Sequence, residues 1–325
     1  MLELRNITKT FRVAKRKKGV AAAARSLFHR EYEEVRALDG ISFRVDRGEI
    51  VGFIGPNGAG KSTAIKIMSG ILVPDSGECT IMDMTPWKSR RKYVGRIGVV
   101  FGQRTQLWWD VPVQDSFDLL RDIYKIPQDR YEANRAELGE VLELAPLLKT
   151  PLRQLSLGQR MRCEIAASLL HDPEVLFLDE PTIGLDAVSK IAVRRFIAHL
   201  NKTRNITVIL TSHDMDDIEA LTDRILLIGQ GRMLYDGPLG KIRERYDRVR
   251  RLELTFEPCA EPPLFDGLTL VSWKDTHGIY EVDTHRISLS QALRKLGDQL
   301  SIVDMSAGSR PIEEIIAALY QEGAV

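Results

Sequence analysis

The sequence predicts an α/β fold with a largely parallel sheet, followed by a smaller α+β domain. Three observations predict it. A short apolar run, residues 49–54, leads through a glycine-rich turn directly into a stretch with helical periodicity. Two further apolar runs, residues 175–178 and 206–210, show no alternation, as expected for parallel strands that are covered on both faces. The stretch from about 112 to 170 has few strand signals and is expected to be a series of helices.

The composition is that of a globular chain. Its 325 residues suffice for about two domains, and 44% hydrophobic with 28% charged residues excludes a disordered chain. The formal net charge is only +1, so no global field would attract nucleic acid or anionic lipid to the whole surface. Any basic surface that binds an acidic partner must therefore be confined to a part of the chain.

Cysteine usage and the apolar runs indicate the compartment. Cys79, Cys163 and Cys259 are widely spaced without a CxxC pair, so neither a disulfide framework nor a thiolate metal site is predicted. Charges interrupt the first residues where a signal peptide needs an apolar stretch, and no run approaches the roughly 18 apolar residues of a membrane span. We expect a cytoplasmic protein unless a partner holds it at a membrane.

The first elements surround an unusual insert. Residues 2–11 and 41–45 are expected to be strands, and residues 12–36 between them contain a basic cluster followed by an Ala-rich, helical stretch. The insert is either a solvated surface insertion or a contact with phospholipid headgroups or a membrane-embedded partner. The basic cluster also leaves nucleic-acid binding open as a distant alternative.

The remaining elements follow the same patterns. Residues 189–200 have helical periodicity, and residues 225–228 form another apolar run before a turn. A composition shift near residues 236–240 ends the first domain, and residues 241–325 form the C-terminal accessory domain. In that domain we expect helices at 241–251, 288–300 and 311–321, and strands at 251–257 and 278–284. His277 and His285 have no spaced partner and are interpreted as structural.

The segment Gly55–Ser62, GPNGAGKS, matches the pattern G-x-x-x-x-G-K-[ST] of a phosphate-binding loop. Its glycines let backbone N–H groups surround phosphates, and the helix that begins at Lys61 adds the positive end of its dipole. Lys61 supplies a charge to the β- and γ-phosphates, and the Ser62 hydroxyl is placed for Mg²⁺. The predicted binding residues for ATP and Mg²⁺ in this loop are Asn57, Gly58, Gly60, Lys61, Ser62 and Thr63.

The segment Val175–Pro181, VLFLDEP, ends a buried strand with two carboxylates at the edge where open α/β sheets bind ligands. Asp179 is expected to hold Mg²⁺ through its water shell, and Glu180 to polarise the attacking water. The alternative is a strand that merely ends in acidic residues. The upstream phosphate loop disfavours that alternative.

The segment LSLGQ, residues 155–159, precedes a helical run. Ser156 stands at the N-cap position, where its hydroxyl and the free amides of the first turn form an anion site. On its own such a pattern is usually only a helix cap.

These segments occur in a particular order together with Gln103, GLD at 184–186 and SHD at 212–214. In that order the sequence, from residue 1 to about 240, resembles the nucleotide-binding subunit of ATP-binding cassette (ABC) transporters. The resemblance implies a P-loop ATPase fold with a helical subdomain at about 104–170. The roles that it implies are phosphate and magnesium binding by Lys61 and Ser62, metal and water sensing by Gln103, a catalytic carboxylate at Glu180, and a γ-phosphate contact from His213.

The resemblance also implies a dimer. Ser156 and Gly158 would act on ATP held by the other copy, with Asp186 near the seam, and Gln159 is also expected to bind nucleotide. The chain departs from the family pattern at three places: Leu157 replaces the third residue of LSGGQ, Phe11 takes the place of the adenine-stacking tyrosine, and Gly102 separates Phe101 from Gln103.

The partners follow from the same resemblance. We expect a homodimer, or paired ATPase subunits, with two separate transmembrane permease subunits at the cytoplasmic face of the membrane, and no nucleic acid. Trp108 and Trp109 either grip a short cytoplasmic helix of a permease or pack between subdomains. The small C-terminal domain resembles that of drug and polysaccharide exporters; an importer subunit is the near alternative, and a cassette ATPase acting on ribosomes or DNA is a distant one.

Overall fold

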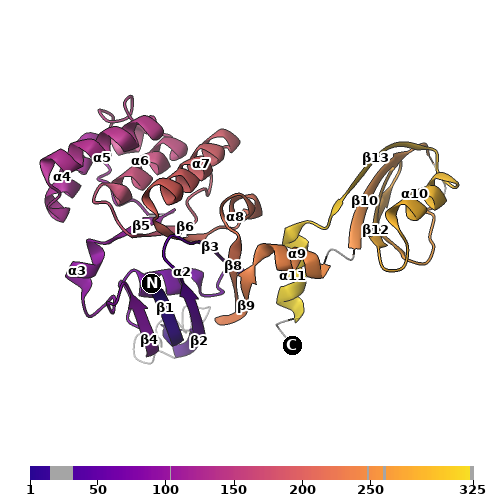
Figure 1. Ribbon diagram of the computed structural model, residues 1–325, viewed down its shortest axis with the longest axis horizontal. Coiled ribbons are helices and arrows are strands. Elements are labelled where there is room, and N and C mark those ends of the chain that lie inside the picture. The colour runs from indigo at the N-terminus through magenta and orange to yellow at the C-terminus, as the bar shows by residue number, and fades with distance from the viewer. Residues whose placement is uncertain (15–31, 103, 247–248, 259–260, 323–325) are drawn as a thin grey trace, which may run out of the picture. The chain divides into compact units, whose positions relative to one another are not determined.

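The computed structural model describes residues 1–14, 32–102, 104–246, 249–258 and 261–322. It contains two compact units, Met1–Gly237 and Pro238–Val325, which we describe separately (Figure 1). Within the described ranges, no helix combines the length and apolarity that a bilayer crossing requires.

The larger unit is built on a six-stranded sheet. In spatial order its strands are β5 (Ile97–Phe101), β6 (Val175–Asp179), β7 (Thr207–Thr211), β3 (Ile50–Ile54), β8 (Arg224–Gly229) and β9 (Arg232–Pro238). The pairs from β5 to β8 are parallel, so their carboxyl ends meet at one edge of the sheet. Most side chains of these strands are buried, which explains why their sequences do not alternate.

Helix α2 (Lys61–Met68) lies between this sheet and a smaller antiparallel sheet (Figure 1). The smaller sheet has the order β2 (Tyr32–Val45), β1 (Leu2–Ala14), β4 (Ser76–Ile81). One continuous core joins the three layers and includes Leu4, Ile65 and Phe177. Because α2 starts at the phosphate loop, this core fixes the position of the loop.

Strands β1 and β2 extend further than the sequence predicts. The insert at 12–36 is expected to be a basic cluster followed by a helical stretch, yet residues 12–14 and 32–36 continue the hairpin. The pairs of this extension include Phe11 with Val35, Arg12 with Glu34 and Ala14 with Tyr32. Aromatic and β-branched residues favour such a pleated surface, and these cross-strand pairs outweigh the helical pattern. The rest of the expected insert, residues 15–31, lies outside the described residues.

Helices cover the other face of the six-stranded sheet (Figure 1). Three of them lie between β5 and β6 in sequence: α4 (Val113–Tyr124), α5 (Gln128–Val141) and α6 (Leu157–Leu169). They are followed by α7 (Ala187–Arg204) and by the short α8 (Met215–Leu221). Another short helix, α3 (Arg90–Val94), precedes β5.

The smaller unit contains a four-stranded antiparallel sheet. Its spatial order is β11 (Leu268–Lys274), β12 (His277–Asp283), β10 (Val249–Phe256) and β13 (Ile302–Ser309). Its core includes residues from β10, from β12 and from helix α10 (Leu289–Gly297). Helices α9 (Leu239–Tyr246) and α11 (Ile312–Glu322) complete the unit.

Two expectations for this unit are wrong. The helix expected over 241–251 ends at Tyr246, because Val249–Phe256 alternates into the core as a strand. Strands β11 and β13 were not expected. Strand β13 is an edge strand that is exposed along almost its whole length, so it lacks the alternation that marks half-buried strands.

His171 connects the helical part of the larger unit to β5. Its Nε2 lies 2.8 Å from the carbonyl oxygen of Ile97, and its ring stacks on Tyr124 with centroids 4.1 Å apart. Burial lowers the pKa of His171, because the charged imidazole would lose its water. The folded protein therefore favours the neutral ring.

This lowered pKa makes stability depend on pH. Below about pH 6.5, the ordinary pKa of histidine, the unfolded chain takes up a proton at His171 that the folded chain does not. We expect the contribution of His171 to stability to be fully present above that pH and to decline by up to about 1.4 kcal/mol per pH unit below it. Urea unfolding of the parent and of His171→Phe, which keeps a ring beside Tyr124 but cannot be protonated, measures the difference. Parallel pH profiles for the two proteins would contradict it.

Candidate nucleotide-binding site

The glycine-rich loop between β3 and α2 lies tightly against β2. Gly60, the N-cap of α2, has φ 109°, in the range that favours glycine. A Cβ at this position would lie 2.4 Å from the carbonyl oxygen of Ala37 on β2. Any side chain at position 60 would therefore push the loop away from β2.

Lys61 is held inside the loop that it follows. Its Nζ donates hydrogen bonds to the carbonyl oxygens of Gly55, at 2.5 Å, and Pro56, at 3.2 Å. Burial lowers the pKa of Lys61, while the charges of Glu180 and Asp179 oppose this shift. Because Lys61 is only 5% exposed as a residue and its ammonium donates to two neutral carbonyl oxygens, the negative charge of a bound phosphate would stabilise it further.

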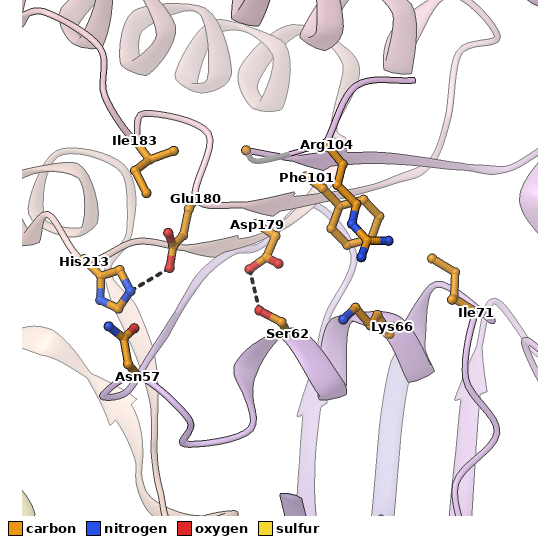
Figure 2. Close-up of a pocket in the computed structure, with 11 residues that line it drawn as sticks. Asn57, Ser62, Lys66, Ile71, Phe101, Arg104, Asp179, Glu180, Ile183 and His213 are labelled. Carbon is orange, nitrogen blue, oxygen red and sulfur yellow. Dashed lines mark hydrogen bonds and ion pairs between the residues drawn. The ribbon is translucent and has the colours of Figure 1, made fainter. Parts of the chain in front are cut away.

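Asp179 ends β6 directly opposite Thr211, which ends β7. The Thr211 hydroxyl donates a hydrogen bond to Asp179 Oδ1 at 2.7 Å, and the Ser62 hydroxyl approaches the same oxygen at 3.4 Å (Figure 2). A hydroxyl and a carboxylate are oxygen ligands of the type that Mg²⁺ prefers. The donor set thus fits a magnesium ion between the phosphate loop and β6.

Glu180 has an unusual backbone conformation. Its φ of 57° lies in the left-handed region, which costs a non-glycine residue about 1–3 kcal/mol. Its N–H donates to both the side-chain and the main-chain oxygen of Thr211, at 3.0 and 3.1 Å, and these bonds support the turn. The carboxylate consequently diverges from that of Asp179 and lies 2.6 Å from His213 Nε2 (Figure 2).

Asp217, on α8, holds together the loops that carry Glu180 and His213. It is fully buried and accepts hydrogen bonds from the hydroxyls of Thr182 and Ser212, the latter at 2.9 Å. Arg194 Nε, 2.5 Å away, balances its charge. Sequence analysis missed Asp217, because its partners on α7 and after β6 lie 23 and 35 positions away.

Some of these groups line a cavity of about 460 Å³. Its lining includes five residues that the sequence predicts for the site: Asn57, Ser62, Asp179, Glu180 and His213. Sequence analysis missed Lys66 and Arg104, which bring two cations to the same cavity. Gln103, predicted to sense the metal and water, lies outside the described residues.

Nine other predicted residues do not line this cavity in the described part of the chain: Phe11, Gly58, Gly60, Lys61, Thr63, Ser156, Gly158, Gln159 and Asp186. Ser156 caps α6, accepting a hydrogen bond from the N–H of Gln159 at 3.2 Å, while Gln159 Oε1 accepts from the N–H of Ser156 at 2.9 Å. The side-chain oxygen of Gln159 therefore belongs to this capping box.

The helix capped by Ser156 contacts the helix capped by Asp186. A Cβ at Gly158 would lie 2.6 Å from Ser189 Oγ, so glycine permits this close approach. Asp186 accepts hydrogen bonds from the N–H and hydroxyl of Ser189, and these bonds lower the pKa of its carboxyl. Separately, Phe11 lies in β1 with the ammonium of Lys9 5.8 Å from its ring centroid.

A phosphate loop whose serine lines one cavity together with the two acids Asp179 and Glu180, with LSLGQ capping a separate helix, defines a cassette-type ATPase. The chain matches the ABC transporter family over residues 38–183. It is 31% identical over 291 residues to the linearmycin resistance ATP-binding protein LnrL of Bacillus subtilis, spanning 90% of this chain and 86% of the relative. It is 30% identical over 271 residues to the bacitracin transport ATP-binding protein BcrA of Bacillus licheniformis, spanning 82% and 83%.

A solved structure agrees. The dimeric, post-hydrolysis ATP-binding cassette MJ0796 bound to ADP and Pi aligns with a TM-score of 0.61 and 26% identity, over 74% of this chain and 99% of that chain. The chain belongs to the ATP-binding subunits of ABC transporters, and it binds and hydrolyses ATP. The family, fold and enzyme class predicted from the sequence are confirmed.

The contact of Gly60 with β2 predicts a large effect of a single methyl group. Gly60→Ala combines positive φ with a clash against Ala37, and we expect it to lower the free energy of unfolding by about 3 kcal/mol or more. Gly58→Ala is the matched control. It also has positive φ, but its Cβ would meet no atom within 4 Å, so a loss of about 1–2 kcal/mol is expected. Equal losses in urea unfolding without nucleotide would remove the clash as the cause.

Proposed function

We propose that this chain is the ATPase subunit of an exporter, and that it acts as a dimer beneath two separate membrane subunits. The observation that carries the catalytic part is the 2.6 Å contact between Glu180 and His213 at the cavity that Ser62 and Asp179 also line. The relatives named for linearmycin resistance and bacitracin transport support the direction of transport.

The phosphate loop and four residues of the cavity have tasks in the proposed reaction. The loop amides and Lys61 bind the phosphates, and Asn57 lines the cavity beside them. Ser62 and Asp179 would hold Mg²⁺, which when bound offsets the phosphate charge. Glu180 accepts a proton from the attacking water, and His213 orients Glu180 and contacts the γ-phosphate.

The location of LSLGQ supports the dimer. Ser156 caps α6 and does not line the described cavity, and its oxygen already accepts the N–H of Gln159. The proton of its hydroxyl and the first amides of α6 can therefore meet an anion outside this chain's own site. A second copy facing head to tail would bring its phosphates to Ser156 and Gly158 and bring Asp186 to the seam. ATP would then join the copies, and hydrolysis would release them.

The paired tryptophans support a membrane partner. Trp108 and Trp109 are 40% and 47% exposed, an unusual exposure for such large side chains, and aromatic residues are enriched in interfaces. We propose that they grip a cytoplasmic helix of the permease. The chain would thereby lie on the cytoplasmic face of the membrane.

Glu180→Gln tests the catalytic proposal. The amide cannot accept the proton from water, so kcat should fall by about 10²–10⁴-fold while ATP still binds. With Mg-ATP the variant should accumulate as a dimer in analytical ultracentrifugation. Hydrolysis at the parent rate would remove Glu180 from the role of base.

Lys61→Ala is the counterpart of that variant. It removes the charge that meets the phosphates, so ATP affinity itself should fall and no ATP-dependent dimer should form. Unchanged ATP affinity in equilibrium binding would contradict the assigned role of Lys61.

Trp108→Ala tests the membrane partner. We expect the ATPase activity of the separate chain to stay within about twofold, while the share of permease that copurifies with it falls by about tenfold or more. Leu264→Ala removes a similarly exposed apolar side chain from the smaller unit and serves as the control. Full assembly of the Trp108→Ala complex would exclude the proposed contact between the tryptophans and the permease helix.

A further inference from the structure

A buried carboxylate on α6 holds the chain segment 105–109, which follows directly on the cavity residue Arg104. Glu164 is 4% exposed, and its two carboxylate oxygens accept hydrogen bonds from the Thr105 hydroxyl and from the N–H of Gln106, the latter at 3.2 Å. Gln106 also donates from its side-chain amide to the carbonyl oxygen of Glu164 at 3.0 Å. Glu164 therefore fastens the start of this segment to the helix.

A second contact lies one turn nearer the start of α6. The guanidinium of Arg160 lies 5.6 Å from the ring of Trp109. Residues four apart lie on one helix face, so Arg160 and Glu164 present one face of α6 to the segment. Ser156, the cap of the helix, lies a further four residues before Arg160.

The burial and hydrogen bonds of Glu164 indicate that it fixes the position of the segment 105–109. A buried carboxylate is costly unless it is hydrogen-bonded. Burial raises the pKa of Glu164, and the hydrogen bonds from Thr105, Gln106 and Leu107 oppose that rise. An apolar residue in α6 would avoid the cost of burying a charge but would leave the N–H of Gln106 without its acceptor.

The far end of the segment is fixed as well. The N–H of Trp108 donates to the hydroxyl of Ser116 on α4 at 3.2 Å. The segment is thus bonded to two helices of the helical part, while its first residue adjoins the cavity.

We propose that Glu164 is a positioning residue that makes the segment 105–109 and α6 one rigid unit. A shift of this segment when the chain binds its own ATP then moves Ser156, which meets the ATP of the other copy. Glu164 thereby couples the two ATP sites of the dimer. This inference rests on the dimer of the proposed function.

The test compares ATP binding with the events that need both copies. In Glu164→Gln and Glu164→Ala, the affinity of the separate chain for ATP should stay within about twofold. In contrast, kcat should fall about tenfold with KM nearly unchanged, and ATP-dependent dimerisation in a Glu180→Gln background should weaken about tenfold. Glu164→Gln, which keeps one acceptor oxygen, should lie between the parent and Glu164→Ala.

Thr105→Val removes the same hydrogen bond by changing its exposed donor instead of its buried acceptor. It keeps the proposal testable if Glu164→Ala does not fold. Combined with Glu164→Gln it should add little to the effect on kcat, because both changes weaken the same contact between Thr105 and position 164. Glu143→Gln is the matched control: Glu143 pairs with Arg162 of the same helix at 3.1 Å but is 82% exposed. It should leave kcat and dimerisation unchanged.

The outcomes separate this inference from the proposed function. If the variants lower only the melting temperature while kcat and dimerisation stay within about twofold of the parent, Glu164 is merely structural and the inference is overturned. Full additivity of Thr105→Val and Glu164→Gln would overturn it too. If the parent shows no ATP-dependent dimer at all, the proposed function fails and the coupling fails with it.

Discussion

The arrangement of the acids at the carboxyl ends of the parallel strands depends on the register between β6 and β7, which places Asp179 opposite Thr211. Thr211 uses one hydroxyl twice, donating to Asp179 and accepting from the N–H of Glu180. That single side chain directs two consecutive acids to different tasks. A shift by one residue would turn the side chains of the strand to the opposite face and abolish the arrangement. The geometry of the site is therefore a property of the sheet.

Sequence analysis succeeds where the signal is local. The phosphate loop, the acids after an apolar run and the cap at Ser156 are each contained in a few consecutive residues, and the structure contains the strands and helix that carry them. Sequence analysis fails where partners are distant or exposed. The end of β1 and the start of β2 are strands because they pair with each other across a gap in the sequence. The edge strand β13 is exposed along almost its whole length, so its sequence shows no alternation of apolar and polar residues.

The acids that sequence analysis missed share one property. Asp217 and Glu164 are both buried, and each joins segments that are distant in sequence through hydroxyl or amide donors. No spacing rule marks such a residue, because its meaning depends on which loops the fold brings to it. Neither residue lines the cavity. Asp217 holds the loops that carry Glu180 and His213, and Glu164 holds the segment that follows the cavity residue Arg104.

The long hairpin of β1 and β2 has an implication for evolution and engineering. Ala14 and Tyr32 are paired, so their Cα atoms lie about 5 Å apart and whatever chain joins them leaves and returns at nearly the same point. Doubling the length of a flexible connection between two such points costs only about 0.6 kcal/mol. A tag, a reporter or a whole module inserted between these two paired residues would therefore cost the ATPase domain little stability.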